Sequence, residues 1–249
     1  MSETKGPLDP GLYIVSTPIG NLGDITLRAL AVLRGVDAIA AEDTRVTRRL
    51  LAHYGITTPL VSYHEHNAGN MRPRLLERLA ARERIALVSD AGTPLIADPG
   101  FKLVEAVAAA GIAIFSVPGP SALAAALSVA GLPTDRVLFA GFLPTRAAAR
   151  RKVIAELATV PASLVVYETP HRLKKSLADL AAGLGDRPAA LCRELTKLHE
   201  EVRRDRLPAL AAAAAAGDIT LRGECVLVIG PPPERHRVSA DDVEAALRS

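Results

Sequence analysis

Aromatic residues are scarce in this chain of 249 residues, which has four Tyr, four Phe and no Trp. Proteins that bind single-stranded nucleic acid without sequence preference stack the bases on rows of aromatic side chains. The composition excludes such a platform as the main mode of binding, and it requires cores built from Ala, Leu, Val and Ile. A net charge of +3 permits a polyanionic partner but does not require one.

Cysteines and long apolar runs are also few. Cys192 and Cys225 each lie in an apolar run and form no C-x-x-C pattern, which predicts two small core residues in a reducing compartment. No apolar run reaches the roughly 20 residues of a membrane-spanning helix, and residues 1–10 lack the pattern of a signal peptide. We therefore expect a soluble, cytoplasmic protein without a membrane partner.

Short β-branched runs alternate with helical patterns along the whole chain. Strands are predicted at residues 12–16, 38–41, 60–63, 85–89 and 112–117, and helices at 26–33, 44–54, 71–82 and 100–110. This order is typical of an α/β fold with a mostly parallel sheet, whose ligands bind beyond the carboxyl ends of the strands.

A second α/β series follows residues 118–120, where two prolines flank a glycine and neither strand nor helix can continue. Helices are predicted at 121–130, 147–158, 173–184 and 207–216, and strands at 137–142, 163–168, 189–194 and 225–230. We therefore predict an N-terminal lobe at residues 8–117, a C-terminal lobe at 121–232 and a short tail at 233–249.

Glycine and proline gather where the first, fourth and fifth predicted strands end, at residues 17–24, 89–100 and 117–121. Glycine lets a backbone approach a ligand closely, and Ser121 is placed to cap the next helix. Neither G-x-G-x-x-G nor G-x-x-x-x-G-K-[ST] occurs. We expect one shared ligand site, better suited to a nucleoside without phosphates than to a nucleotide.

Six blocks of sequence resemble the signature set of the ribosomal RNA small subunit methyltransferase I family. They are LYIVSTPIGNLGDIT (12–26), AEDTR (41–45), SDAGTP (89–94), PGP (118–120), YETPHR (167–172) and CRELTK (192–197). The match spans roughly residues 11–230 in the order of the family, which belongs to the tetrapyrrole methylase superfamily.

The resemblance implies two α/β lobes with S-adenosylmethionine bound in the cleft between them. Eight positions match cofactor contacts of the family. They are Gly92, Thr93 and Ile96 in the loop after the fourth strand, Ser121 and Ala122 at the interlobe helix, and Tyr167, Leu195 and Glu224 at strand ends of the second lobe.

The resemblance also implies a function: 2′-O-methylation of a cytidine in 16S ribosomal RNA, within the 30S subunit, by a homodimer. Two alternatives stay open. One is a methyltransferase of the same superfamily that acts on a tetrapyrrole, and the other is a ribosome-assembly factor that binds the cofactor without transferring a methyl group.

A ribose hydroxyl is a poor nucleophile until a base shares its proton, so acidic and basic residues near the predicted site are candidates. They are Asp24, Glu42, Asp43, Asp90 and Lys197. Asp43 and Asp24 are equally well placed to cap helices. His64 and His66 have no further ligands nearby in the sequence, so no metal is expected.

Two basic clusters are predicted on helix surfaces. Arg146, Arg150, Arg151 and Lys152 begin one helix, and Arg45, Arg48 and Arg49 lie on another. Such clusters are usually solvated, but on the cleft side they attract phosphates.

Two features depart from the family pattern. Family members usually continue as a small helical C-terminal module, whereas here only residues 238–249 stand in its place. If that module binds rRNA in the family, we expect this chain to bind rRNA weakly. Asp205 also stands where the pattern has a glycine.

Overall fold

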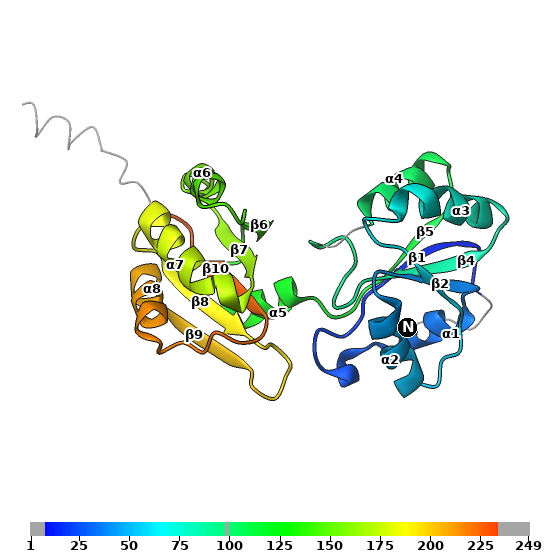
Figure 1. Ribbon diagram of the computed structural model, residues 1–249, viewed down its shortest axis with the longest axis horizontal. Coiled ribbons are helices and arrows are strands. Elements are labelled where there is room, and N and C mark those ends of the chain that lie inside the picture. Colours follow the sequence, from blue (N-terminus) through cyan, green and yellow to red (C-terminus); the bar gives the residue numbers. More distant parts are fainter. Residues whose placement is uncertain (1–7, 98–99, 234–249) are drawn as a thin grey trace, which may run out of the picture.

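The first half of the chain forms a parallel five-stranded sheet. The computed structural model describes residues 8–97 and 100–233. Its first sheet has the order β3-β2-β4-β1-β5, and every neighbouring pair is parallel (Figure 1). The strands are β1 (Gly11–Val15), β2 (Ala38–Ala41), β3 (Leu60–Ser62), β4 (Arg84–Val88) and β5 (Ile114–Val117).

Helices cover both faces of this sheet, as the alternating pattern predicted. Leu33 of α1 (Leu27–Gly35) and Leu51 of α2 (Thr44–His53) pack into the core on one face. The other face is covered by α3 (Ala68–Ala80) and α4 (Phe101–Ala109). All five strands therefore end at one edge, and the loops that follow them gather there.

The second half forms a mixed sheet. Its order is β6-β7-β10-β8-β9, and only β6 and β7 run parallel. The strands are β6 (Val137–Phe142), β7 (Ser163–Glu168), β8 (Pro188–Arg193), β9 (Glu201–Arg206) and β10 (Cys225–Ile229). The predicted division into domains at 8–117 and 121–232 stays a prediction, and all but residue 233 of the predicted tail lies outside the described residues.

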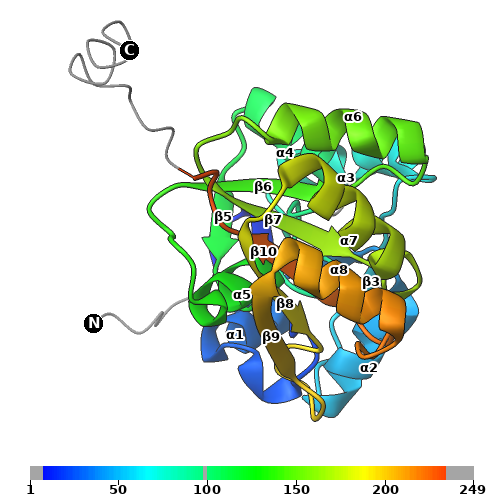
Figure 2. The ribbon, with the colours of Figure 1, turned by 90° about the vertical axis from the view of Figure 1, so that its left-hand side faces the viewer.

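Four helices cover the second sheet. One face carries α6 (Ala147–Leu157), α7 (Pro170–Leu184) and α8 (Leu207–Ala216), and Figure 2 shows α7 and α8 crossing in front of the strands. The other face carries α5 (Ala122–Ala130), which follows the crossing from the first sheet (Figure 1). Ile19, from the loop after β1, is buried in the same cluster as Ala126 of α5 and thereby joins the two halves. No helix of the described segments is long and apolar enough to cross a membrane.

Strand β9 was missed in the sequence, and the start of α7 was placed too late. The β9 segment reads EVRRDR and pairs only with β8, so its charged side chains lie on an edge strand where apolar alternation is not needed. Helix α7 begins at Pro170 rather than at residue 173, because proline is well tolerated at the first helical position, which needs no N–H partner.

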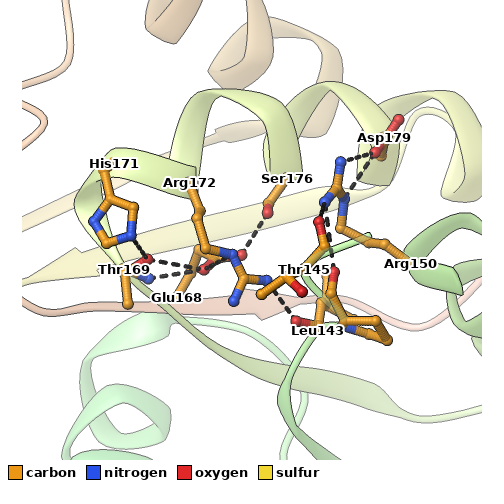
Figure 3. Close-up of polar contacts among 10 residues, drawn as sticks. Leu143, Thr145, Arg150, Glu168, Thr169, His171, Arg172, Ser176 and Asp179 are labelled. Carbon is orange, nitrogen blue, oxygen red and sulfur yellow. Dashed lines mark hydrogen bonds and ion pairs between the residues drawn. The ribbon is translucent and has the colours of Figure 1, made fainter. Parts of the chain in front are cut away.

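Arg150 was predicted to lie in a basic cluster on a helix surface, either solvated or attracting phosphates, and for this residue the prediction was wrong. Its side chain is 7% exposed and donates from Nε to Asp179 Oδ2 at 2.7 Å (Figure 3). Arg151, whose side chain is 70% exposed, donates to the other oxygen of Asp179. Burial alone raises the pKa of Asp179, but the hydrogen bonds from Arg151 and Arg150 outweigh it and hold the pKa below its ordinary value.

We expect Arg150→Ala to lower the free energy of unfolding by about 3–5 kcal/mol, because it removes the buried partner of the Asp179 carboxylate together with the hydrogen bond to Thr145 O. Arg151→Ala is the matched control and should lower the free energy of unfolding by less than about 1 kcal/mol, because the Arg151 side chain is mostly solvated. Urea denaturation of both variants measures the difference. Equal losses would show that Arg150 does not hold the helix pair α6–α7 together.

Candidate active site

Two loops are joined at the carboxyl edge of the first sheet. Thr17, after β1, and Gly92, after β4, exchange both backbone hydrogen bonds, Thr17 N to Gly92 O at 2.8 Å and Gly92 N to Thr17 O at 3.0 Å. Gly92 has φ +81°, a conformation that favours glycine. The loop after β4 is therefore held against the loop after β1 by a pair of backbone hydrogen bonds, and the Thr17 hydroxyl adds a donation to Ser89 O at 3.2 Å.

Thr93 joins a third loop to this pair. Its hydroxyl lies 2.9 Å from Ser16 Oγ and donates to the carbonyl of Pro120 at 3.0 Å. The glycine- and proline-rich loops after β1, β4 and β5 thus meet, as their positions at strand ends predicted.

A cavity of about 400 Å³ opens beside these loops, and we call it the strand-end cavity. Its volume lies within the range of small-molecule sites, about 300–1,000 Å³. Both halves of the chain line it. The lining residues are Ile19, Glu42, Asp90, Ala91, Gly92, Thr93, Ile96, Ala97, Ser121, Ala122, Phe142, Tyr167, Glu168, Thr169, Pro170, Glu224, Cys225 and Val226.

The structure places seven of the eight predicted cofactor positions around this cavity: Gly92, Thr93, Ile96, Ser121, Ala122, Tyr167 and Glu224. Leu195 is the exception. It is 7% exposed and packs in the core cluster that contains Ile19 and Val226. Leu195 therefore supports the wall without lining it.

Ser121 is the N-cap residue of α5, as predicted, but the expected side-chain cap is absent. Ser121 occupies the position before α5, but its hydroxyl accepts no hydrogen bond from the helix. The residue instead lines the cavity at the start of α5.

Sequence reasoning missed several lining residues, including Ile19, Phe142 and Val226. Phe142 and Val226 lie in predicted strands, and only the tertiary structure places them at the strand-end cavity. Glu168 could have been found, because it belongs to the YETPHR block.

Glu168 is a buried carboxylate that holds one wall of the cavity together. Its side chain is inaccessible to solvent, it accepts from Thr169 N at 2.8 Å, and Arg172 Nε lies 3.3 Å away (Figure 3). Ser176, one turn further along α7, donates to its second oxygen. These contacts fix the turn from β7 into α7 beside Tyr167.

Only Glu42 and Asp90, of the five predicted acid–base candidates, line the strand-end cavity. Asp24 ends the short 3-10 helix η1 (Leu22–Asp24) and is exposed. It does not cap α1, because Thr26 accepts the hydrogen bond from Ala29 N instead.

Asp43 acts as the predicted cap of α2. It accepts from Arg45 N at 2.8 Å and forms an ion pair with the Arg45 guanidinium at 2.6 Å. The side-chain and backbone hydrogen bonds from Arg45 lower the pKa of Asp43 to about 2. Such a carboxylate is a weak base at neutral pH.

Lys197 lies between two carboxylates, of which Glu224 lines the strand-end cavity. Its ammonium group donates to Glu194 at 2.9 Å and to Glu224 at 3.0 Å. Burial lowers its pKa, but these hydrogen bonds outweigh burial and raise the pKa above its ordinary value. Lys197 is therefore charged at neutral pH and is unsuited to act as a base.

Asp90 borders a second hollow as well. This hollow, which we call the α2 groove, has a volume of about 390 Å³ and lies between α2 and the loop after β1. Asp90 accepts a hydrogen bond from Asp43 N at 2.9 Å, which orients its carboxylate. Asp90 alone is shared by the linings of the strand-end cavity and the α2 groove.

The chain is similar to known proteins over most of its length. Residues 11–211 match the family model of the Tetrapyrrole (Corrin/Porphyrin) Methylases. The ribosomal RNA small subunit methyltransferase I of Xylella fastidiosa is 52% identical over 222 residues, which cover 88% of this chain and 81% of that protein. The protein of the same name from Mesorhizobium japonicum is 50% identical, over 94% of this chain and 80% of its own length.

The chain belongs to the ribosomal RNA small subunit methyltransferase I family of tetrapyrrole methylases.

A solved structure of the wider family has the same fold. The uroporphyrin-III C-methyl transferase from Thermus thermophilus, crystallised with S-adenyl homocysteine, has a TM-score of 0.60 and 21% identity, and the match covers 88% of this chain and 97% of that one. The predicted fold, two α/β lobes of the tetrapyrrole methylase type, is confirmed.

Methyltransferases of this family use S-adenosylmethionine, and the charge of the residues lining the strand-end cavity is compatible with that molecule. S-Adenosylmethionine has a positively charged sulfonium group and no phosphate. The described lining includes four carboxylates, Glu42, Asp90, Glu168 and Glu224, and no Lys, Arg or His. Arg172 forms an ion pair with Glu168, and Lys197 forms one with Glu224.

Proposed function

We propose that this chain transfers a methyl group from S-adenosylmethionine to the 2′-oxygen of a cytidine in 16S ribosomal RNA. The observation that carries the proposal is the strand-end cavity, built from the blocks shared with the family and lined by apolar and acidic side chains. The relatives' names, which specify the small-subunit rRNA, support the choice of substrate.

The residues that line the strand-end cavity contribute to the proposed binding of S-adenosylmethionine in different ways. When bound, S-adenosylmethionine supplies a methyl group activated by a positive sulfur. The bare backbone of Gly92 allows close approach, Phe142 and Tyr167 provide an apolar wall, and the carboxylates favour a cation over a phosphate. The negative charges of these carboxylates disfavour nucleotides, because phosphate groups are also negatively charged.

Asp90 is the proposed base. It accepts the proton that the ribose hydroxyl loses as its oxygen forms the new bond to the methyl carbon and the carbon–sulfur bond breaks. Asp90 is preferred to Glu42 because its carboxylate borders both the strand-end cavity and the α2 groove, where an acceptor can lie. Positioning the two reactants in line contributes much of the rate.

The assembled 30S subunit is the proposed substrate, a homodimer the proposed assembly, and the cytoplasm the proposed location. A chain with eight Tyr and Phe residues, no Trp and a net charge of +3 is suited to many weak phosphate contacts over a shaped surface rather than to base stacking.

Two assays test the function. Calorimetry should show S-adenosylhomocysteine binding that survives EDTA, because the proposed site uses no metal. Methyl transfer from labelled S-adenosylmethionine is then compared on 30S particles, naked 16S rRNA, free cytidine and uroporphyrinogen. We expect 2′-O-methylcytidine from the particles or the long RNA, and at least about tenfold less from free cytidine, which lacks the phosphate contacts.

Two other outcomes of these assays would each indicate one of the alternative functions. Methyl groups found only on the tetrapyrrole would make the chain a tetrapyrrole methyltransferase. Cofactor binding without transfer to any of the four acceptors would indicate an assembly factor without catalytic activity.

A further inference from the structure

The α2 groove has two well-defined walls. One wall is the face of α2 that carries Val46, Arg49, Leu50 and His53, spaced at i, i+3, i+4 and i+7. The other wall is the loop after β1, with Thr17, Pro18, Gly20 and Leu22. The hydroxyl of Tyr54 donates to the carbonyl of Leu22 at 2.5 Å and ties this loop to the end of α2.

The chemistry of the α2 groove differs from that of the strand-end cavity. Arg49 and His53 are its basic residues, and Asp90 is the one acid among its described lining residues. Leu22 and Val46 leave 41% and 40% of their surface exposed, which is unusual for large apolar side chains. The groove therefore offers an apolar surface, a guanidinium and one carboxylate within about 390 Å³.

We propose that the α2 groove binds the acceptor nucleotide of the RNA. The base packs against Leu22 and Val46, Arg49 holds an adjacent phosphate, and the ribose hydroxyl lies at Asp90, where the groove meets the strand-end cavity. Arginine matches phosphate geometry with two parallel donors, and the apolar wall suits the flat face of a base. This inference rests on the proposed RNA methyltransferase function and assigns a site to its second substrate.

Two adjacent arginines of α2 allow a sharp test. Arg49 lines the groove, whereas Arg48 lines a separate hollow with Leu51, Ile56 and Thr58 on another side of the helix. Both arginines are exposed, so replacing either should leave the fold intact. The sequence alone offers no basis for separating them.

We compare wild type, Arg49→Gln and Arg48→Gln in methyl transfer to 30S particles at several salt concentrations. Arg49→Gln should raise KM for the particles about tenfold, the loss expected from one charge-assisted phosphate contact. Its kcat and its affinity for S-adenosylhomocysteine should stay within about twofold of wild type, since Arg49 does not line the strand-end cavity. The slope of log(kcat/KM) against log salt should become shallower by about 0.7–0.9 for Arg49→Gln.

Arg48→Gln should leave KM for the particles within about twofold of the wild-type value and should leave the salt slope unchanged, because Arg48 lies outside the α2 groove. Equal effects of the two substitutions, or a loss in kcat alone for Arg49→Gln, would overturn the assignment of the groove while the RNA methyltransferase function stands. Absence of transfer to any RNA by the wild-type protein would instead refute the proposed function, and the nucleotide site with it.

Discussion

Gly92→Val should weaken the binding of S-adenosylhomocysteine about 100-fold. Gly92 has φ +81°, where a β-branched residue is strained by about 1–3 kcal/mol, and an added Cβ would lie 3.3 Å from Ile19 Cγ2. Relief of that strain must move the loop that Thr17 and Thr93 hold beside the cavity. A 100-fold loss of affinity corresponds to about 2.7 kcal/mol of binding free energy. This value lies within the strain energy of about 1–3 kcal/mol expected for valine at position 92.

Gly111→Val is the matched control. Gly111 also has a positive φ, +68°, but no atom lies within 4 Å of an added Cβ, and the residue does not line the strand-end cavity. Both variants should lose stability through backbone strain, and only Gly92→Val should lose cofactor affinity. Calorimetry below the unfolding midpoint of both variants measures this, and equal affinities would place the cofactor elsewhere.

Asp90→Asn should reduce kcat for methyl transfer to 30S particles by about 10²–10⁴, the usual contribution of a positioned base. Asparagine keeps an oxygen that can accept the hydrogen bond from Asp43 N, so the loop should keep its shape. Affinity for S-adenosylhomocysteine should change little, because the lost charge is one of several carboxylates around the cavity.

Two further substitutions separate the remaining candidates. Asp24→Asn should leave kcat within about twofold of wild type, since Asp24 is exposed and lines neither the cavity nor the groove. Glu42→Gln removes the other carboxylate that was expected to act as a base. A larger loss in kcat for Glu42→Gln than for Asp90→Asn would transfer the role of base to Glu42.

The α/β order and most element positions were predictable because they depend on local pattern. Apolar runs bounded by glycine and proline predicted nearly every strand, and parallel strands joined by helices necessarily bring their carboxyl ends to one edge. The meeting of the loops at Thr17, Gly92 and Pro120 was therefore foreseeable from the sequence.

Strand direction in the second sheet was not predictable in the same way. Strand β10 is antiparallel to both β7 and β8, although each of the three is an ordinary apolar run. Pairing partners are chosen by contacts far apart in the sequence. The edge strand β9 has a single apolar residue, Val202, which is too little for an apolar alternation to be recognised in the sequence.

Side chains with similar local sequence were separated only by tertiary contacts. Arg150 is buried against Asp179 while its neighbour Arg151 is exposed, and Arg49 faces the α2 groove while Arg48 does not. The candidate carboxylates were also distinguished only by tertiary contacts. Asp43 caps its own helix, whereas Asp90 lines both the strand-end cavity and the α2 groove.

The sequence by itself therefore determined the family, the fold class and the strand-end loops that form the proposed cofactor site. The tertiary structure decided which side chains reach that site and revealed the groove beside it. The reason is physical: periodicity and turn residues are properties of neighbouring positions, whereas a cavity is the space left between elements that meet from distant parts of the chain.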